Sequence, residues 1–233
     1  MVAPNISIPA ALIGEPTRAA ILTALCDGRS RSAGELADAA GISAQSASNH
    51  LGLLLSGGLI TVVQQGRHRY FRLASPAVAQ SIEALAAIAP PLRLARLGRQ
   101  RGHAALQQAR KCYSHLAGRL GVQLHDALLA RGTIAPVQTT DTGRTVYRLT
   151  EAGRVGLRGL GMDEEVSGLS CIDWTERRDH LAGPLGTALL RHLQAQQAFE
   201  PGPEPRSLRL TARGEAVLRA LGVNASEPVA ERA

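Results

Sequence analysis

The stretch GELADAAGISAQSASNHLGLLLSGGLITVVQQGRHRYFRL, residues 34–73, decides the fold of the first part of this chain. Ser32 and Glu35 have the S-x-x-E spacing of a capping box, which predicts a helix that begins at residue 33. Gly41 supplies a tight turn, and Ser43 is a natural N-cap for a further helix over residues 44–56. The stretch therefore predicts two helices joined by a short turn.

The helix predicted over residues 44–56 has two different faces. Ala47, Leu51 and Leu54 recur at the spacing of a buried stripe. Gln45 and Asn49 lie near the centre of the opposite face, with Ser46 and Ser48 beside them. Amide side chains can pair with adenine in the major groove of DNA, and hydroxyl groups can bind phosphate or a base edge. An ordinary solvated polar face would have the same pattern, so the neighbouring elements must decide.

A basic hairpin follows this helix. Residues 59–63 and 69–73 are predicted strands, joined by residues 64–68 with Gly66 in the turn. Arginines on such a hairpin suit a wing that contacts phosphate or the minor groove. The order helix, turn, helix and basic hairpin favours DNA binding over the solvated face. The candidate DNA-contacting residues are Ser43, Gln45, Ser46, Ser48, Asn49, Arg67, His68 and Arg69.

Together with PTRAAILTALCDG at residues 16–28, the quoted stretch resembles the ArsR/SmtB family of winged helix-turn-helix regulators. The resemblance covers residues 1–90. It implies a homodimer, an imperfect palindromic operator in double-stranded DNA, and release from that operator by an effector. Members of the family pair through a first helix and the helix after the wing, here residues 6–13 and 76–89. Val78, Ile82, Leu85 and Ile88 share one face of the second of these helices, as pairing requires.

The family's metal sites do not carry over to this chain. Ala37 and Ala39 stand where the family's thiol pair lies on the helix before the turn. The helix after the wing offers only Glu83 where another branch has Asp, His and Glu ligands. A third branch has two cysteines in the recognition helix, where this chain has Leu53 and Gly57. We therefore expect no metal in residues 1–90 and no cofactor.

Composition indicates a globular protein with a basic first half. Apolar residues make up 45% of the 233 residues, and the formal charge is +7. Residues 112–233 carry equal numbers of basic and acidic side chains, so the positive excess lies in the part that is predicted to bind DNA. The chain has no apolar run of the ~20 residues that span a bilayer and no signal-peptide pattern. We therefore expect a cytoplasmic protein without a membrane partner.

The second half contains an internal repeat. HLAG occurs at residues 115–118 and 180–183, and RLT at residues 148–150 and 209–211. Each copy is predicted to be a long helix, a polar loop, a strand and a helix capped by Thr150 or Thr211. The expected fold is mainly α with short β-hairpins (α+β), a winged helix-turn-helix followed by two helix–hairpin–helix repeats. The predicted divisions are 1–90, a basic connecting helix or linker 91–111, a repeat domain 112–223 (copies 112–162 and 171–223) and a tail 224–233.

The repeat also brings together residues that bind metals. Cys112 and His115 begin the first copy, and Cys171 and His180 lie in the second, together with the carboxylate of Asp173. Thiolates and imidazoles are ligands of soft or borderline metals. The same cysteines are equally compatible with small core residues, and the histidines with hydrogen bonding to buried backbone. If the four groups bind an effector, we expect the site in a cleft where the starts of the two HLAG helices meet.

These observations predict a DNA-binding transcriptional regulator of the repressor type, whose effector, a small molecule or a metal ion, is sensed in the second half. A metal- or redox-responsive regulator that uses the four Cys and His residues is a variant of this hypothesis. An enzyme fused to a DNA-binding module is the alternative of a different class. The sequence has no phosphate-binding loop, nucleophile elbow or zinc-protease motif, so we expect no enzyme.

Overall fold

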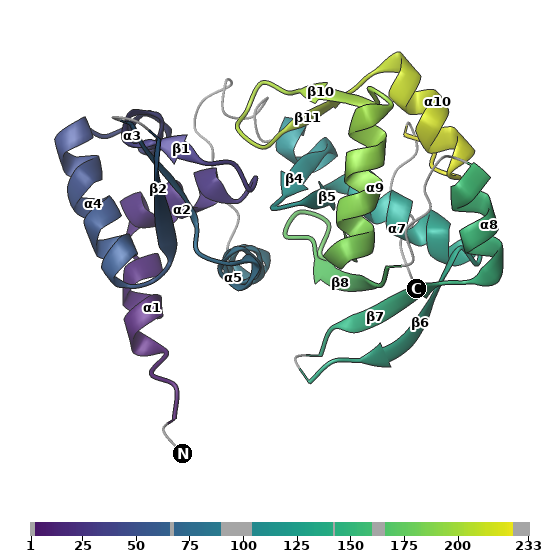
Figure 1. The fold of residues 1–233 in the computed structure, drawn as a ribbon, viewed down its shortest axis with the longest axis horizontal. Coiled ribbons are helices and arrows are strands. Elements are labelled where there is room, and N and C mark those ends of the chain that lie inside the picture. The colour runs from purple at the N-terminus through teal and green to yellow at the C-terminus, as the bar shows by residue number, and fades with distance from the viewer. Residues whose placement is uncertain (1–2, 66–67, 90–103, 142, 160–165, 226–233) are drawn as a thin grey trace. The chain divides into compact units, whose positions relative to one another are not determined.

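A computed structural model describes residues 3–65, 68–89, 104–141, 143–159 and 166–225 (Figure 1). The chain divides into two compact units, Met1–Ile82 and Glu83–Ala233, each of which has its own core. Arg67, residues 91–103 of the predicted linker and residues 226–233 of the predicted tail lie outside the described residues. Among the described residues, no helix is both long and apolar enough to cross a lipid bilayer.

The first unit consists of helices packed beside a small antiparallel sheet. The capping box predicted for Ser32 and Glu35 is confirmed, and Gly41 ends that helix in the left-handed conformation. The sheet has the order β1-β3-β2. The elements are α1 (Ser7–Ile13), α2 (Pro16–Leu25), β1 (Arg31–Ser32), α3 (Ala33–Ala40), α4 (Ala44–Ser56), β2 (Ile60–Gln65), β3 (His68–Leu73) and the start of α5 (Pro76–Ile88).

Leucine and isoleucine side chains from α2, α3 and α4 fill the core of this unit, as the helical spacing predicts. The strands of the hairpin are longer than predicted, since β2 reaches Gln65 and β3 starts at His68. The polar residues 64, 65 and 68 therefore extend the ladder instead of forming a loop. The largest fully buried side chains of the unit are Ile21, Leu22, Leu25, Leu36, Leu51 and Leu54.

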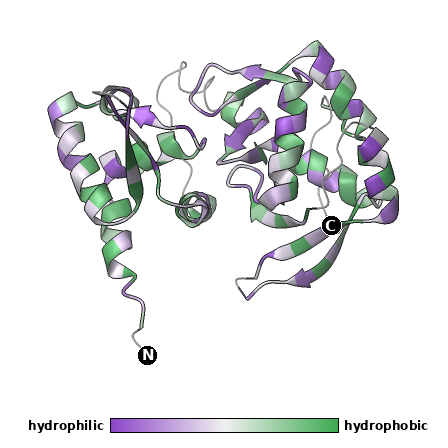
Figure 2. Cartoon of the chain, in the orientation of Figure 1, coloured by the Kyte–Doolittle hydropathy of each residue, from purple (hydrophilic) through white to green (hydrophobic). Residues whose placement is uncertain are grey.

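The second unit runs through the order hairpin, helix, hairpin, helix twice. The first series is β4 (Arg110–Cys112), β5 (His115–Ala117), α7 (Arg119–Ala130), β6 (Ile134–Thr139), β7 (Thr145–Leu149) and α8 (Glu151–Gly159). The second is β8 (Gly168–Ile172), β9 (Asp179–Ala182), α9 (Gly183–Ala195), β10 (Phe199–Pro201), β11 (Leu208–Leu210) and α10 (Ala212–Ala220). In Figure 2, hydrophobic and hydrophilic segments alternate along these helices, as amphipathic packing requires.

The two series of the second unit pack crosswise. Helix α7 of the first series lies on β9 of the second, and α9 of the second lies on β5 of the first. Strands β6, β7, β8 and β9 form one antiparallel sheet in that order, while β4 pairs with β5 and β10 with β11. One apolar cluster joins leucines of α7 and α9, so the two series share a single core.

The start of each series differs from the prediction of a long helix. Residues 110–117 and 168–182 form hairpins, and the helices begin only at Arg119 and Gly183. Gly118 and Gly183 adopt φ of 79° and 73°, a left-handed conformation that separates each HLAG strand from its helix. The N-caps predicted at Thr150 and Thr211 are confirmed, because their hydroxyl oxygens accept hydrogen bonds from the N–H groups of Gly153 and Gly214.

Candidate functional sites: a nucleic-acid interface and a buried Cys/His cluster

Helix α4 presents a polar face to solvent because its other face is held in the core. Ala47, Leu51 and Leu54 are fully or almost fully buried, as predicted. The Ser43 hydroxyl oxygen accepts a hydrogen bond from the Ser46 N–H at 3.2 Å, which fixes the start of the helix. These contacts determine which residues of α4 remain available to a partner.

The predicted DNA-contacting residues of α4 lie on its solvent side. Ser43, Gln45, Ser48 and Asn49 are exposed, and Ser46 is half-buried. The Ser48 hydroxyl donates to the carbonyl oxygen of Ala44 at 3.0 Å. Two amides and several hydroxyl groups are therefore displayed near the first half of one helix, as reading a major groove requires.

The hairpin β2–β3, which follows α4 in the sequence, has basic side chains on its surface. His68, Arg69 and Arg72 are exposed. The guanidinium of Arg69 lies over the ring of Phe71, with 5.4 Å between its carbon and the ring centroid. This contact supports the arginine stem while its charged end faces solvent. Arg67 lies outside the described residues, so its place on the wing stays a prediction.

Glu15 caps α2 and contacts α4, a role that was not predicted from the sequence. Its carboxylate accepts hydrogen bonds from the N–H groups of Thr17 and Arg18 at 3.0 and 2.8 Å, which caps α2. The same carboxylate lies 3.4 Å from Nδ1 of His50 on α4. The hydrogen bond from Thr17 is the main cause that lowers the pKa of Glu15 to about 2. A glutamate before Pro16 is an indirect capping signal, since serine, threonine and aspartate are the usual N-caps.

The four Cys and His residues singled out in the second half lie together. Their ligand atoms, two Sγ and two imidazole nitrogens, are all within 4.8 Å of one another. We call Cys112, His115, Cys171 and His180 the Cys/His cluster. All four side chains are buried, and His180 has no exposed surface. The structure thus brings these residues together, but on hairpins instead of at the predicted helix starts.

Strand pairing explains how different sequence spacings give the same arrangement. Cys112 and His115 are directly opposite partners in the β4–β5 hairpin. Cys171 and His180 are directly opposite partners in the β8–β9 hairpin. The loops of the hairpins differ in length, so C-x2-H in one and C-x8-H in the other place a thiol and an imidazole side by side.

Polar groups of the cluster contact one another. Nε2 of His115 lies 3.0 Å from Nε2 of His180, so one ring donates to the other when no ion lies between them. A hydrogen bond with Cys171, together with burial, raises the pKa of the Cys112 thiol to about 12. Cys112 lies on strand β4, and no helix begins there.

Asp173 is not part of the cluster, but its carboxylate contacts His180. Its Oδ2 lies 3.5 Å from Nδ1 of His180 and accepts a hydrogen bond of 2.6 Å from the Gly118 N–H. Its Oδ1 accepts from the backbone and hydroxyl of Thr175. Burial alone would raise the pKa of Asp173, but Arg110 and His180 outweigh it and hold that pKa far below its usual value. The carboxylate is therefore ionised next to His180.

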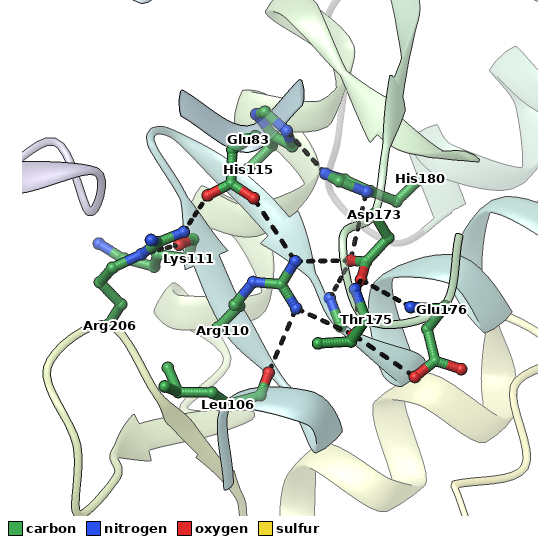
Figure 3. Close-up of polar contacts among 11 residues, drawn as sticks. Glu83, Leu106, Arg110, Lys111, His115, Asp173, Thr175, Glu176, His180 and Arg206 are labelled. Carbon is green, nitrogen blue, oxygen red and sulfur yellow. Dashed lines mark hydrogen bonds and ion pairs between the residues drawn. The ribbon is translucent and has the colours of Figure 1, made fainter. Parts of the chain in front are cut away.

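Figure 3 shows how Arg110 continues this network. Its guanidinium is completely buried, 3.0 Å from Asp173 Oδ2, and stacks 4.7 Å above the Trp174 ring. Glu83, the first residue of the unit, forms ion pairs with Arg110 and Arg206. Although burial raises the pKa of Glu83, the two arginines lower it overall. Two buried carboxylates thus face two buried guanidinium groups.

Arg110 falls within the predicted linker 91–111, but in the structure it lies on a strand. Strand β4 begins at Arg110, and the side chain is the largest fully buried one described. A basic residue in a basic stretch carries no signal of burial, because its partners Asp173 and Glu83 are distant in the sequence. The side chain of Asp173, two residues after Cys171, was recognisable as a potential ligand but not as the partner of His180.

Comparisons with known proteins agree with the fold of the first unit. A family model described as a helix-turn-helix domain matches residues 13–63. The HTH-type transcriptional regulator YdfF of Bacillus subtilis (strain 168) is 38% identical over 219 residues, which cover 91% of this chain and 94% of YdfF. This relative therefore extends over both units.

Solved structures match the amino-terminal third of the chain. The homodimeric winged helix-turn-helix domain of Mb0332 from Mycobacterium bovis, a possible ArsR-family regulator, is 29% identical and covers 34% of this chain and 73% of its own, with a TM-score of 0.33. The transcriptional repressor BigR from Xylella fastidiosa is 25% identical over 37% of this chain and 88% of its own, with a TM-score of 0.35. The first unit contains a helix-turn-helix domain followed by a β-hairpin wing, and the chain belongs to the HTH-type transcriptional regulators.

Proposed function

We propose that the protein is a homodimeric repressor that binds an imperfect palindrome in double-stranded DNA and is released by an effector sensed in its second unit. The observation that carries the proposal is the exposed amide and hydroxyl face of α4, with Gln45 and Asn49 at its centre. These groups suit base readout, and the arginines of the wing suit phosphate contacts. Bound across a promoter, such a dimer would exclude the transcription machinery.

Exposed apolar side chains support the dimer. Ile6 and Ile8 at the start of α1 are 76% and 57% exposed, and Leu85 and Ile88 on α5 are 45% and 78% exposed. Large aliphatic side chains at this exposure favour burial against a second copy of the chain. A twofold-symmetric dimer would present two α4 helices to half-sites about one helical turn apart.

The Cys/His cluster supports sensing in the second unit, since it brings four potential metal ligands together outside the winged helix-turn-helix. The metal- and redox-responsive variants of the hypothesis both use these residues. The relatedness to YdfF favours a regulator over an enzyme fused to a DNA-binding module.

The function is tested with the full chain and a library of random duplexes. Repeated selection should enrich a motif of two inverted half-sites, bound by two chains as measured by analytical ultracentrifugation. The affinity for the selected duplex should fall steeply with salt, because arginines displace counterions from phosphates. A reporter promoter that overlaps the motif should be repressed. Enrichment of no motif, or tight binding by a single chain without salt dependence, would contradict the proposal.

A further inference from the structure

We propose that the Cys/His cluster binds one divalent ion of the zinc class, in a closed tetrahedral site that joins the two hairpins of the second unit. The proposal names the chemistry of the sensing unit. The role of the ion in regulation rests on the proposed function, whereas the binding of the ion does not. The solved structures compared above match only about the first third of the chain and therefore do not include this site.

The donor set and its shape fit such an ion. Zinc–sulfur and zinc–nitrogen bonds of about 2.3 and 2.0 Å give a tetrahedron whose edges are roughly 3.3 to 3.8 Å. The four donor atoms here lie within 4.8 Å of one another, and the two imidazole Nε2 atoms are 3.0 Å apart. Shifts of less than about 1 Å would therefore complete the coordination sphere. Two sulfurs and two imidazoles favour Zn2+ or Cd2+ over Mg2+ and Ca2+, which prefer oxygen.

The contact between His180 and Asp173 orients the His180 imidazole as metal sites require. Because Nδ1 of His180 lies 3.5 Å from Oδ2 of Asp173, an acceptor, the ring proton belongs on Nδ1 and the lone pair of Nε2 faces the cluster. The Arg110 guanidinium and the Gly118 N–H hold that carboxylate in place. This carboxylate–histidine arrangement is the one that increases the basicity of a metal-ligating imidazole.

Burial and charge also suit a bound ion. Two thiolates neutralise a divalent cation, so a Cys2His2 centre carries no net charge into the interior. Small apolar residues, Ala117 and Ala182, pack around the two cysteines. All four ligands come from the protein and all are buried, which leaves no position for a substrate. The site is therefore of the closed kind that stabilises a fold.

Glycines on α7 and α9 lie beside the cluster. A Cβ on Gly121 of α7 would lie 3.6 Å from Cβ of His180, and one on Gly186 of α9 would lie 3.3 Å from Cβ of His115. Each histidine thus packs against the helix of the other series. An ion held by both hairpins would connect the two series.

Metal binding is tested with the full chain, purified without oxygen and stripped of metal by a chelator. Titration with Zn2+ against a chromophoric chelator should give one ion per chain. Titration with Co2+ should give thiolate-to-cobalt absorption in the near ultraviolet and the intense visible bands of tetrahedral cobalt. Trp174, the single tryptophan of the chain, lies in this unit, so its fluorescence should report unfolding at a higher temperature when Zn2+ is bound.

Variants assign the binding to these residues. Cys112→Ser and Cys171→Ser should each abolish stoichiometric binding and the thiolate-to-cobalt band, whereas Cys26→Ser, which changes a buried cysteine of the first unit, should retain both. Asp173→Asn should lower the Zn2+ affinity about 10- to 100-fold while the tetrahedral cobalt spectrum persists. The wild-type cobalt spectrum keeps the test decisive if a serine variant fails to fold.

Several results would overturn the site. They are the absence of a cobalt spectrum in the wild-type protein, binding that survives both serine changes, and loss of binding in Cys26→Ser. A Cys112–Cys171 disulfide in the anaerobic protein, seen as a mass lower by two hydrogens, would overturn it in favour of a redox pair. Metal binding is measured without DNA and operator binding without metal, so failure of one proposal is distinguishable from failure of the other.

Discussion

Asn49 and Arg69 represent two kinds of DNA contact that differ in what they recognise. We expect Asn49→Ala to weaken binding to the selected operator by about 1 to 3 kcal/mol and to relax the preference at one base pair, because the amide is a bidentate partner for a base. Arg69→Ala should weaken binding to all duplexes about equally and reduce the salt slope by about 1. Competition anisotropy with single-base operator variants measures both effects.

Matched controls exist for each change. Ser56→Ala alters the last turn of α4 and should leave base preference intact, and Arg213→Ala removes an equal charge from the second unit and should leave the salt slope unchanged. If Arg69→Ala changed base preference while Asn49→Ala lowered affinity uniformly, the assigned faces of helix and wing would be wrong.

Glu15 predicts a dependence of stability on pH. Its folded-state pKa of about 2 is below the ordinary 4.5, mainly through the Thr17 hydrogen bond. Its contribution to folding is therefore complete above pH 4.5 and is lost as pH falls towards 2. We expect Glu15→Gln to be less stable than the wild type at pH 6 and nearly equal to it near pH 2. Urea unfolding followed by far-UV circular dichroism measures the difference. A carboxyl carbon of Glu15 that titrates near 4.5 by NMR would contradict the assignment.

The role of a residue could be predicted from the sequence where it depends on residues close to it in the chain. The capping serines and threonines at 32, 43, 150 and 211 were predictable because each cap depends on residues within three positions. The meeting of Cys112 with Cys171 was only a hypothesis, since nothing local fixes it. Burial of Arg110 could not be foreseen, because its carboxylate partners lie far away in the sequence.

Among the elements, the hairpins that carry the Cys/His cluster were the ones mistaken for helix. Strands β4 and β5 have three residues each, too few to show the alternation of a strand. Their two-residue turn contains Tyr113 at φ 56° instead of the usual glycine or asparagine. The winged helix gave clearer signals, because its helices are long enough to show periodicity and Gly41 marks the end of α3.

The close approach of α7 to β5 and of α9 to β9 predicts a sensitivity to small additions of volume. Cβ atoms on Gly121 and Gly186 would lie 2.6 and 2.3 Å from the carbonyl oxygens of Leu116 and Leu181. We expect Gly121→Ala and Gly186→Ala each to cost about 1 to 3 kcal/mol of stability, since the backbone must move. Guanidinium unfolding followed by Trp174 fluorescence reports the second unit alone.

Gly156→Ala on α8 is the matched control, because a Cβ there meets no atom within 4 Å. In an open helical position alanine should be neutral or stabilising by up to about 1 kcal/mol. Equal behaviour of all three variants would show that α7 and α9 do not approach β5 and β9 as closely as described.

At the scale of the whole molecule, DNA binding and sensing should separate between the units. A chain of residues 1–90 should bind the selected operator within about 1 kcal/mol of the full chain, because the proposed base and phosphate contacts lie between Ser43 and Arg72. Zn2+ should change the operator affinity of the full chain by roughly 5- to 150-fold and leave that of the fragment unchanged. Anisotropy titrations with and without Zn2+ measure both.

Gel filtration and circular dichroism must first show that the fragment is folded and dimeric. A folded fragment that still responded to Zn2+ would place sensing in the first 90 residues. A full chain without any response would show that the ion stabilises the second unit without regulating it.

The crosswise packing of α7 on β9 and of α9 on β5 has a consequence for biosynthesis. When the ribosome has released the first series, α7 has only part of its packing surface, because β9 and α9 have not yet been translated. At about 5 to 20 residues per second, the remaining ~60 residues take several seconds to appear, and the leucines of α7 stay accessible to chaperones for that time. The winged helix needs no later segment for its own core, so the nascent chain acquires its DNA-binding unit before its second unit is complete.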